Sequence, residues 1–428
     1  MDLTVINTIW KPVYGQLVRG MQQLTPEWAN LRQLKNFTQL SPRSINWPVE
    51  LVNGGGIAFS SDGGSTARAT SNEPPEATDS WTHMVGRFEV GFDQLVGENA
   101  SKFTAQQIEK QVRYQAADKL RSFQRAVAMG FYGYPDAIIF AATGANVSNP
   151  SGTQTAFEID SLYGDAGALA TNLRIRDYLT AGKDYINVKV AETSASRNAA
   201  VASVVSIAEA TDIITVDSGT YFGASIAAND AVVLANQVLS GSADDLNLGF
   251  NGLLHLTRGA TVHNIASSAQ PDWVAGVDES SYGSALGGAD LYQWFEEIEQ
   301  RSGHTVEWGY TTVAAIAAAG GAELDQRRYG ADEDTMRLGF KKLNVMGVQV
   351  EGRPYVPSGH LFLGSSTAVQ KIAPDEDIMD VIESGDRAGG FKQYQDRLGF
   401  YKDQVMRSQI AAVSRLGLGV VSGVTENS

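Results

Sequence analysis

The sequence predicts an α+β protein built from several domains. Three features of the 428-residue chain support this class. A long amphipathic helix is predicted over residues 101–129, residues 175–245 carry only strand patterns, and helices mix with strands after residue 249. At about 150 residues per domain, the length predicts two or three domains, each large enough to form a core without a metal or a disulfide.

The composition excludes several classes of function. Lys and Arg total 33 against 48 Asp and Glu, which gives a formal net charge of −15. A chain this acidic is not expected to wrap DNA or to dock on anionic lipid through its overall charge. It contains no cysteine, so disulfide scaffolds, thiolate zinc sites and cysteine nucleophiles are excluded. No signal peptide or membrane-spanning stretch is visible, and we expect no membrane partner.

Residues 1–48 are predicted to form an arm and residues 49–99 an extended loop. Four prolines interrupt the arm, so it is expected to lie across another surface rather than to form a long helix. In the loop, residues 47–52 and 84–92 alternate apolar and polar side chains, as strands do. We therefore predict one long two-stranded hairpin with a polar, glycine-rich tip. A two-stranded ribbon is marginal in water on its own, so this hairpin needs a partner surface.

The extended loop is acidic. Between residues 49 and 99 there are eight carboxylates and two arginines. Three of these carboxylates, Glu73, Glu76 and Asp79, are candidate contacts with another subunit.

Residues 101–129 form the clearest predicted element. Apolar side chains recur at steps of three to five residues, residues 104–107 fit a capping box, and Gly130, Gly133 and Pro135 are expected to end the helix. The helix carries six basic and two acidic side chains. Two interpretations stay open: a solvated polar face, or a docking surface for an acidic partner such as the hairpin of another copy. In the second, the candidate contacts are Arg113, Arg121 and Arg125.

Residues 175–245 are predicted to form a small inserted β domain. Four short strand candidates are separated by Ser, Asn, Asp and Gly, at residues 185–190, 200–207, 213–216 and 231–235. Their close spacing favours an antiparallel barrel or sandwich.

Mixed elements follow residue 249. Helices are predicted at residues 290–300 and 312–319. Strands are predicted at residues 305–310, 344–351 and 360–363, with long strands over 406–421.

Motifs for catalysis, cofactors and metals are missing from the sequence. The five histidines are spread along the chain, and each is interpreted as a surface or packed residue. The acidic clusters at residues 296–299, 332–334 and 375–377 lack the spacing of a calcium loop. No P-loop, dinucleotide fingerprint or nucleophile elbow is present. We therefore predict no catalytic residue, no cofactor, no metal site and no enzymatic activity.

The order of elements, together with four stretches of sequence, resembles the major capsid protein of tailed bacteriophages, which has the Hong Kong 97 fold. Residues 348–364, which end in Gly-His-Leu-Phe-Leu-Gly, look like that family's pair of axial-domain strands. Residues 391–401 and 409–419 resemble its late peripheral strands and the return to the axial domain. Residues 246–254 are similar to the segment that opens the axial domain. The resemblance covers essentially the whole chain and is one of architecture more than of residues.

This resemblance implies a fold with an N-terminal arm, an extended loop, a spine helix, peripheral and axial domains, and an inserted all-β domain. The implied divisions are the arm at 1–48, the extended loop at 49–99, a peripheral domain at 100–174 with its spine helix at 101–129, the inserted barrel or sandwich at 175–245, the axial domain at 246–364, peripheral strands at 365–416, and a C-terminal axial strand and tail at 417–428.

The implied function is that of a shell subunit. Copies would assemble through hexamers and pentamers into an icosahedral capsid that encloses double-stranded DNA without reading its sequence. The resemblance places the protein in the virion, after assembly in the cytoplasm of the host bacterium. Implied partners are a portal protein at one vertex and possible decoration proteins. Because only the arm and the loop precede the helix, the chain is expected either to be already mature or to be served by a separate scaffolding protein.

Two alternatives remain. An encapsulin-like nanocompartment shell protein would share the fold and differ in having a cargo-docking pocket. A multidomain hydrolase with a carboxylate-based site would show turnover as a monomer.

Overall fold

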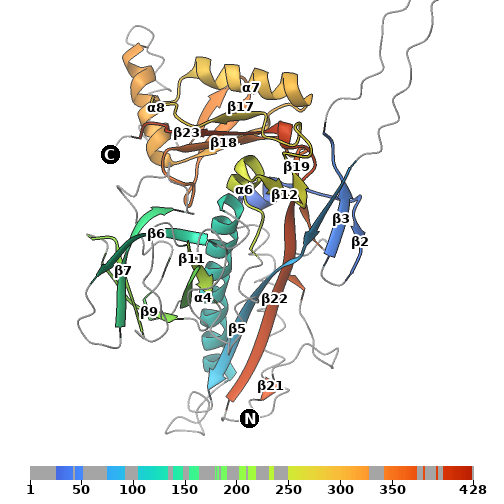
Figure 1. Cartoon of the computed structure of the whole chain (residues 1–428). Helices are drawn as coiled ribbons and strands as arrows, with labels where there is room; N and C mark the ends of the chain where they lie inside the picture. The colour runs from blue at the N-terminus through green and yellow to red at the C-terminus, as the bar shows by residue number, and fades with distance from the viewer. Residues whose placement is uncertain are drawn as a thin grey trace, which may run out of the picture.

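The computed structural model describes most of the chain in several stretches. These are residues 26–41, 44–51, 75–91, 105–133, 138–147, 154–162, 179, 181–182, 185–189, 202–208, 211–217, 231–235, 249–326, 342–373, 379–380, 392–393 and 399–426. Helices and sheets are both prominent, which confirms the α+β class. A long helix runs through the middle of the molecule, with a β-barrel on one side, a pair of long strands on the other, and a mixed sheet at its C-terminal end (Figure 1).

The long helix is α4 (Ala105–Tyr132), and it confirms the predicted helix with its end moved. Phe123 and Val127, from the predicted apolar stripe, are buried. Gly130 does not stop the helix; a Cβ there would lie 2.7 Å from the Phe250 ring, so the glycine admits that side chain. The helix ends before Gly133, where the backbone approaches Gly252 so closely that a Cβ on Gly252 would lie 2.3 Å from the Gly133 carbonyl oxygen.

The mixed sheet has six strands in the order β14-β23-β18-β15-β17-β16. They are β14 (Val277–Glu279), β15 (Trp308–Thr311), β16 (Lys342–Val345), β17 (Val348–Gly352), β18 (His360–Gly364) and β23 (Leu418–Ser422). Helix α7 (Gly288–Ser302) packs on β14, β16 and β23, and α8 (Val313–Gln326) packs on β17. These elements confirm the helices and strands predicted after residue 249.

One detail of that prediction is wrong. The single strand predicted over residues 344–351 is a hairpin of β16 and β17, because Met346 and Gly347 have φ values of 52° and 87° and form a tight turn. Residues 348–364 contain two strands, β17 and β18, as expected. Strand β15 lies between β17 and β18, parallel to the first and antiparallel to the second.

The helix is joined to the mixed sheet by aromatic side chains. The Tyr310 ring on β15 meets the rings of Phe131 and Tyr132 edge-on, at centroid distances of 6.0 and 6.2 Å. Tyr132 also packs against Phe362 on β18, at 5.9 Å. Edge-to-face rings at these distances are attractive beyond the area they bury, so the helix end is held firmly on the sheet.

The longest strand is β22 (Gly399–Ala412), and its partner is β5 (Thr82–Gly91). Ten residue pairs join them, from Gly399 with Gly91 to Ser408 with Thr82. Strands β1 (Arg32–Gln33), β19 (Val369–Ile372), β20 (Met379–Asp380) and β21 (Lys392–Gln393) complete this sheet. Strands β22 and β23 confirm the long strands predicted over residues 406–421, with a short 3-10 turn between them at Arg415–Gly417.

The predicted pairing within the extended loop is wrong. Residues 84–92 were expected to pair with residues 47–52, but β5 pairs with β22, and β3 (Ser44–Pro48) pairs with β4 (Glu76–Ser80). Strand β3 has five residues and cannot match the ten of β5, whereas β22 can. The short β2 (Thr38–Gln39) lies on the other edge of β3.

The inserted β domain is a closed barrel in the order β10-β7-β6-β11-β8-β9. Strands β8 (Tyr185–Lys189), β9 (Ala202–Ala208), β10 (Ile213–Asp217) and β11 (Ala231–Ala235) confirm the four predicted strands. Strands β6 (Ile138–Val147) and β7 (Gln154–Leu162) were missed, so the predicted start at residue 175 divides the barrel. Gly, Ser and Asn interrupt the alternation of β6 and the link to β7, which hides them in the sequence.

The predicted arm is in part a core segment. From Pro26 onwards it packs on the body of its own chain: Trp28 and Leu31 are buried, and the Trp28 ring lies 5.2 Å from that of Phe250. Trp28 lies in helix α2 (Pro26–Asn30), and β1 then pairs parallel to β19. The sequence predicts an arm that lies across another surface, and for these residues that surface is the body of the same chain. Residues 1–25 lie outside the described residues.

Arg415 lies in the short turn between β22 and β23, where the chain passes from one large sheet to the other. Its guanidinium is buried and donates to the carbonyl oxygens of Leu256 (2.6 Å), Thr257 (2.9 Å), Gly259 (3.1 Å) and Trp273 (2.6 Å). Three of these carbonyls belong to the end of helix α6 (Leu253–Arg258), where a cation also meets the negative end of the helix dipole. Burial lowers the pKa of Arg415 to about 10, so it remains charged at neutral pH.

We expect the substitution Arg415→Met to lower the free energy of unfolding by about 3 kcal/mol or more, because it leaves several buried carbonyls without a donor. The measurement is urea unfolding followed by circular dichroism. The matched control is Arg32→Ala, which removes an exposed ion pair with Glu307 (3.2 Å) and should cost less than about 1 kcal/mol. Equal losses in the two variants would contradict the role given to Arg415.

Candidate functional site

The base of the extended loop is the best-defined candidate site. We call the pair β3 and β4 the ribbon base, since these strands hold the two ends of the chain that runs between residues 52 and 74. Ile45, Trp47 and Ala77 are buried, and Trp47 lies opposite Ala77 in the register. The small alanine leaves room beside the indole, so the ribbon base has an apolar side that packs on the body.

The ribbon base is fastened to the last residue of β22. The indole Nε1 of Trp47 donates to the carbonyl oxygen of Ala412 at 3.0 Å, and the Ala412 N–H donates to Nε2 of His263 at 3.1 Å. The Trp47 and His263 rings meet edge-on with centroids 4.8 Å apart. The carbonyl of the buried Ala412 is therefore bonded by Trp47, and its N–H is bonded by His263.

Asp79 on β4 supplies the charge of this site. One carboxylate oxygen contacts Nδ1 of His263 at 2.7 Å and accepts from the Asn251 amide; the other accepts from the Ser80 N–H at 2.6 Å. Nε2 of His263 is already an acceptor for Ala412, so the proton of the neutral ring sits on Nδ1 and points at Asp79. The carboxylate is thus satisfied by three donors within its own chain.

A tight turn presents His263 to the ribbon base. His263 and Asn264 have φ values of 53° and 63° and connect β12 (Thr261–Val262) with β13 (Ile265–Ala266). Histidine and asparagine tolerate this left-handed region better than most residues. The His263 carbonyl accepts from the Thr78 N–H (3.2 Å), and the Asn264 amide donates to the Thr78 carbonyl (3.0 Å). The turn therefore covers part of the edge of β4.

The β3 side of the ribbon base has its own attachment. The Glu50 N–H donates to the Val413 carbonyl at 2.8 Å, and the Glu50 carboxylate contacts Nε2 of His304 at 3.0 Å. Nδ1 of His304 lies 2.9 Å from the Thr367 hydroxyl. The two strands of the ribbon base are thus each tied to the body through a carboxylate and a histidine.

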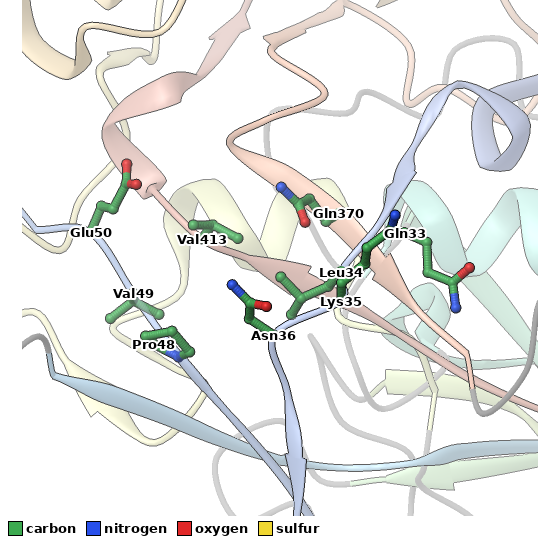
Figure 2. Close-up of a pocket in the computed structure, with 9 residues that line it drawn as sticks. All are labelled: Gln33, Leu34, Lys35, Asn36, Pro48, Val49, Glu50, Gln370 and Val413. Atoms are coloured by element: carbon green, nitrogen blue, oxygen red, sulfur yellow. The ribbon is translucent and has the colours of Figure 1, made fainter.

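A groove separates the ribbon base from the segment before it (Figure 2). Residues 33–36 form one wall, residues 48–50 form the other, and Gln370 and Val413 lie between them. The groove has a volume of about 480 Å³ and is lined by amide, charged and apolar side chains. The described attachments of the ribbon base are the pairing of β2 with β3, the bonds to Asn251, the 263–264 turn and His304, and the bonds to residues 409–413.

The predicted contact residues do not lie together in the structure. Asp79 is the one that belongs to the site. Glu76 is exposed and accepts from the Asn46 amide at 2.5 Å, Arg121 is exposed, and Arg125 is partly buried. Glu73 lies outside the described residues, as does the side chain of Arg113. Their role as contacts between subunits stays a prediction.

Sequence reasoning missed most of the site. It treated Trp47 as part of a strand, gave His263 no role beyond packing, and did not consider Asn251. One available signal was the His-Asn pair between Val262 and Ile265, which fits a two-residue hairpin turn. Within the described ranges no cluster of three or more metal-ligating side chains occurs, and no helix there has the length and hydropathy to cross a bilayer.

Comparisons with known proteins give structural similarity only. No protein-family model matches the sequence, and no curated protein does. Among solved structures, the capsid asymmetric unit of cyanophage A-1(L) is 13% identical with a TM-score of 0.48, and the match covers 95% of this chain and 93% of that one. The capsid of a native GTA particle is 10% identical with a TM-score of 0.43, over 94% of this chain and 91% of that one.

A shorter match is to an encapsulin. The SrpI encapsulin complex from Synechococcus elongatus PCC 7942 is 15% identical with a TM-score of 0.26, over 41% of this chain and 59% of that one.

The substitution Asp79→Asn is expected to lower the free energy of unfolding by about 2 kcal/mol, because an amide cannot accept from all three donors and places a donor against another donor. Urea unfolding measures the loss. Glu76→Gln is the matched control on the same strand: that side chain is exposed with one amide partner, and the change should stay within about 0.5 kcal/mol. If both variants unfold at the wild-type midpoint, the Asp79 network does not hold the ribbon base.

Proposed function

We propose that this chain is the major capsid protein of a tailed bacteriophage and that copies of it form an icosahedral shell. One observation carries the proposal. The structure combines a long helix, a pair of long strands beside it and a mixed sheet at the helix end, which supports the fold that the resemblance implied (Figure 1). The strand near the C-terminus, β23, lies in that sheet between β14 and β18, which supports the implied C-terminal return to the axial domain.

The organisation of the molecule suits a shell subunit. One continuous apolar core runs from the ribbon base through the barrel and α4 into the mixed sheet, so each copy is a single stable building unit. The ribbon base flanks the chain between residues 52 and 74 on both sides. In a shell, that chain would reach a neighbouring copy, and hexamers and pentamers would close through such contacts.

The contacts that we propose are electrostatic in part. The acidic loop, including Glu73 and Glu76, would meet the basic face of α4 on another copy through Arg113, Arg121 and Arg125. Arg121 and Glu76 are exposed and available for this role, whereas Asp79 is engaged within its own subunit. Opposite charges on two surfaces guide association and exclude wrong registers.

The proposed shell would have defined contents and partners. The shell would enclose double-stranded DNA without reading it, and the net charge of −15 would limit adhesion of the genome to the wall. A scaffolding protein during assembly, a portal at one vertex and decoration proteins are further proposed partners. The protein would act as a structural component of the virion, assembled in the host cytoplasm, and not as an enzyme.

Deleting residues 54–72 and joining the ends with a short Gly-Ser linker tests the role of the loop. The deletion leaves Pro75, whose carbonyl accepts from the Val49 N–H, and the whole ribbon base in place. We expect a folded subunit with unchanged far-ultraviolet circular dichroism that no longer forms shells in negative-stain electron microscopy. Assembly at the wild-type level would refute the role of the loop, and outright unfolding would show that the tip belongs to a core.

A further inference from the structure

His263 is buried with both ring nitrogens in use. Its side chain has no exposed surface, Nδ1 faces Asp79 at 2.7 Å, and Nε2 accepts from the Ala412 N–H at 3.1 Å. Only the neutral ring with its proton on Nδ1 satisfies both partners. A second proton would have to sit on Nε2, where it would point at the N–H of Ala412.

The titratable and charged neighbours of His263 lie on several elements. Asp79 faces it from β4, and His255 faces it from α6, with Arg415 beyond. Burial, and then His263 itself, lower the pKa of His255 to about 4, so His255 stays neutral at pH 5. Trp47 from β3, Asn251 and Ala412 from β22 complete the surroundings and carry no charge.

His304, on the other side of the ribbon base, has different hydrogen-bond partners. Its Nε2 faces the Glu50 carboxylate, and its Nδ1 faces the Thr367 hydroxyl, which can donate or accept. A protonated His304 can therefore donate to both partners and lose neither contact. Only the His263 attachment has a hydrogen bond that a proton must break.

We infer that protonation of His263 releases the 263–264 turn from β22 while leaving the turn joined to the ribbon base. The added proton places two donors face to face at Ala412, so that hydrogen bond is lost. The same charge strengthens the contact with Asp79, which keeps β4 and the turn together. Acidification thus opens the contact between the turn and Ala412, whose carbonyl still accepts from Trp47. This local opening follows from the geometry of the subunit and does not depend on the proposed function.

Hydrogen exchange of the full-length chain, read by mass spectrometry and corrected for intrinsic rates, tests the inference. Spectra at about pH 7.5 and about pH 5 bracket the range in which histidines generally gain a proton. We expect protection in peptides covering residues 409–413 to fall about tenfold at the lower pH, because the Ala412 bond is lost. Protection of residues 76–80, which include the Thr78 amide held by the turn, should be retained.

Two variants assign the effect. His263→Gln can still donate to Asp79 and accept from Ala412, but it does not titrate, so its protection at residues 409–413 should not change with pH. His304→Gln is the matched control and should behave as the wild type. An unchanged wild type, or an equal fall in His263→Gln, would overturn the inference. If His263→Gln does not fold, a fall confined to residues 409–413 in both the wild type and His304→Gln supports it, and equal protection at both pH values overturns it.

Discussion

The structure depends on one junction, residues 409–415, where β22 ends and the chain turns into the mixed sheet. The Gln409 side chain donates to the Ser80 carbonyl and accepts from the Asn251 N–H, and both backbone groups of Ala412 are bonded by the ribbon base and the 263–264 turn. Arg415 then holds the end of α6. Four parts of the molecule are fixed to one another within seven residues, and Gln409, Ala412 and Arg415 are all buried. Because unmet buried hydrogen bonds are costly, this junction sets the relative positions of its neighbours.

Two kinds of contact hold the subunit together. Apolar packing fixes the helix against the mixed sheet through Phe131, Tyr132 and Tyr310. The ribbon base is held both by its buried apolar side chains and by hydrogen bonds that include two histidines. Packed aromatic contacts change little with conditions, whereas hydrogen bonds to histidine respond to protons. The packing of the helix is thus insensitive to pH, whereas the histidine hydrogen bonds beside the ribbon base respond to it.

Local patterns in the sequence predicted local structure well, and pairing between distant segments poorly. Helix α4 and barrel strands β8 to β11 follow from periodicity, which each segment carries by itself. The partner of β5 does not follow from periodicity, because the alternation in β5 is compatible with either β3 or β22. The length of β5 matches β22 and not β3. The candidate site was harder still: the buried Arg415 and the half-buried Asp79 look like surface charges until the fold surrounds them with acceptors or donors.

The central claim is that copies of this chain build a closed shell. The most direct measurement is negative-stain electron microscopy of the purified full-length protein, alongside light scattering, first alone and then with a scaffolding partner. The account predicts closed shells, tubes, or hexameric and pentameric capsomers. A monomer that persists at high concentration, even with the partner present, would contradict it.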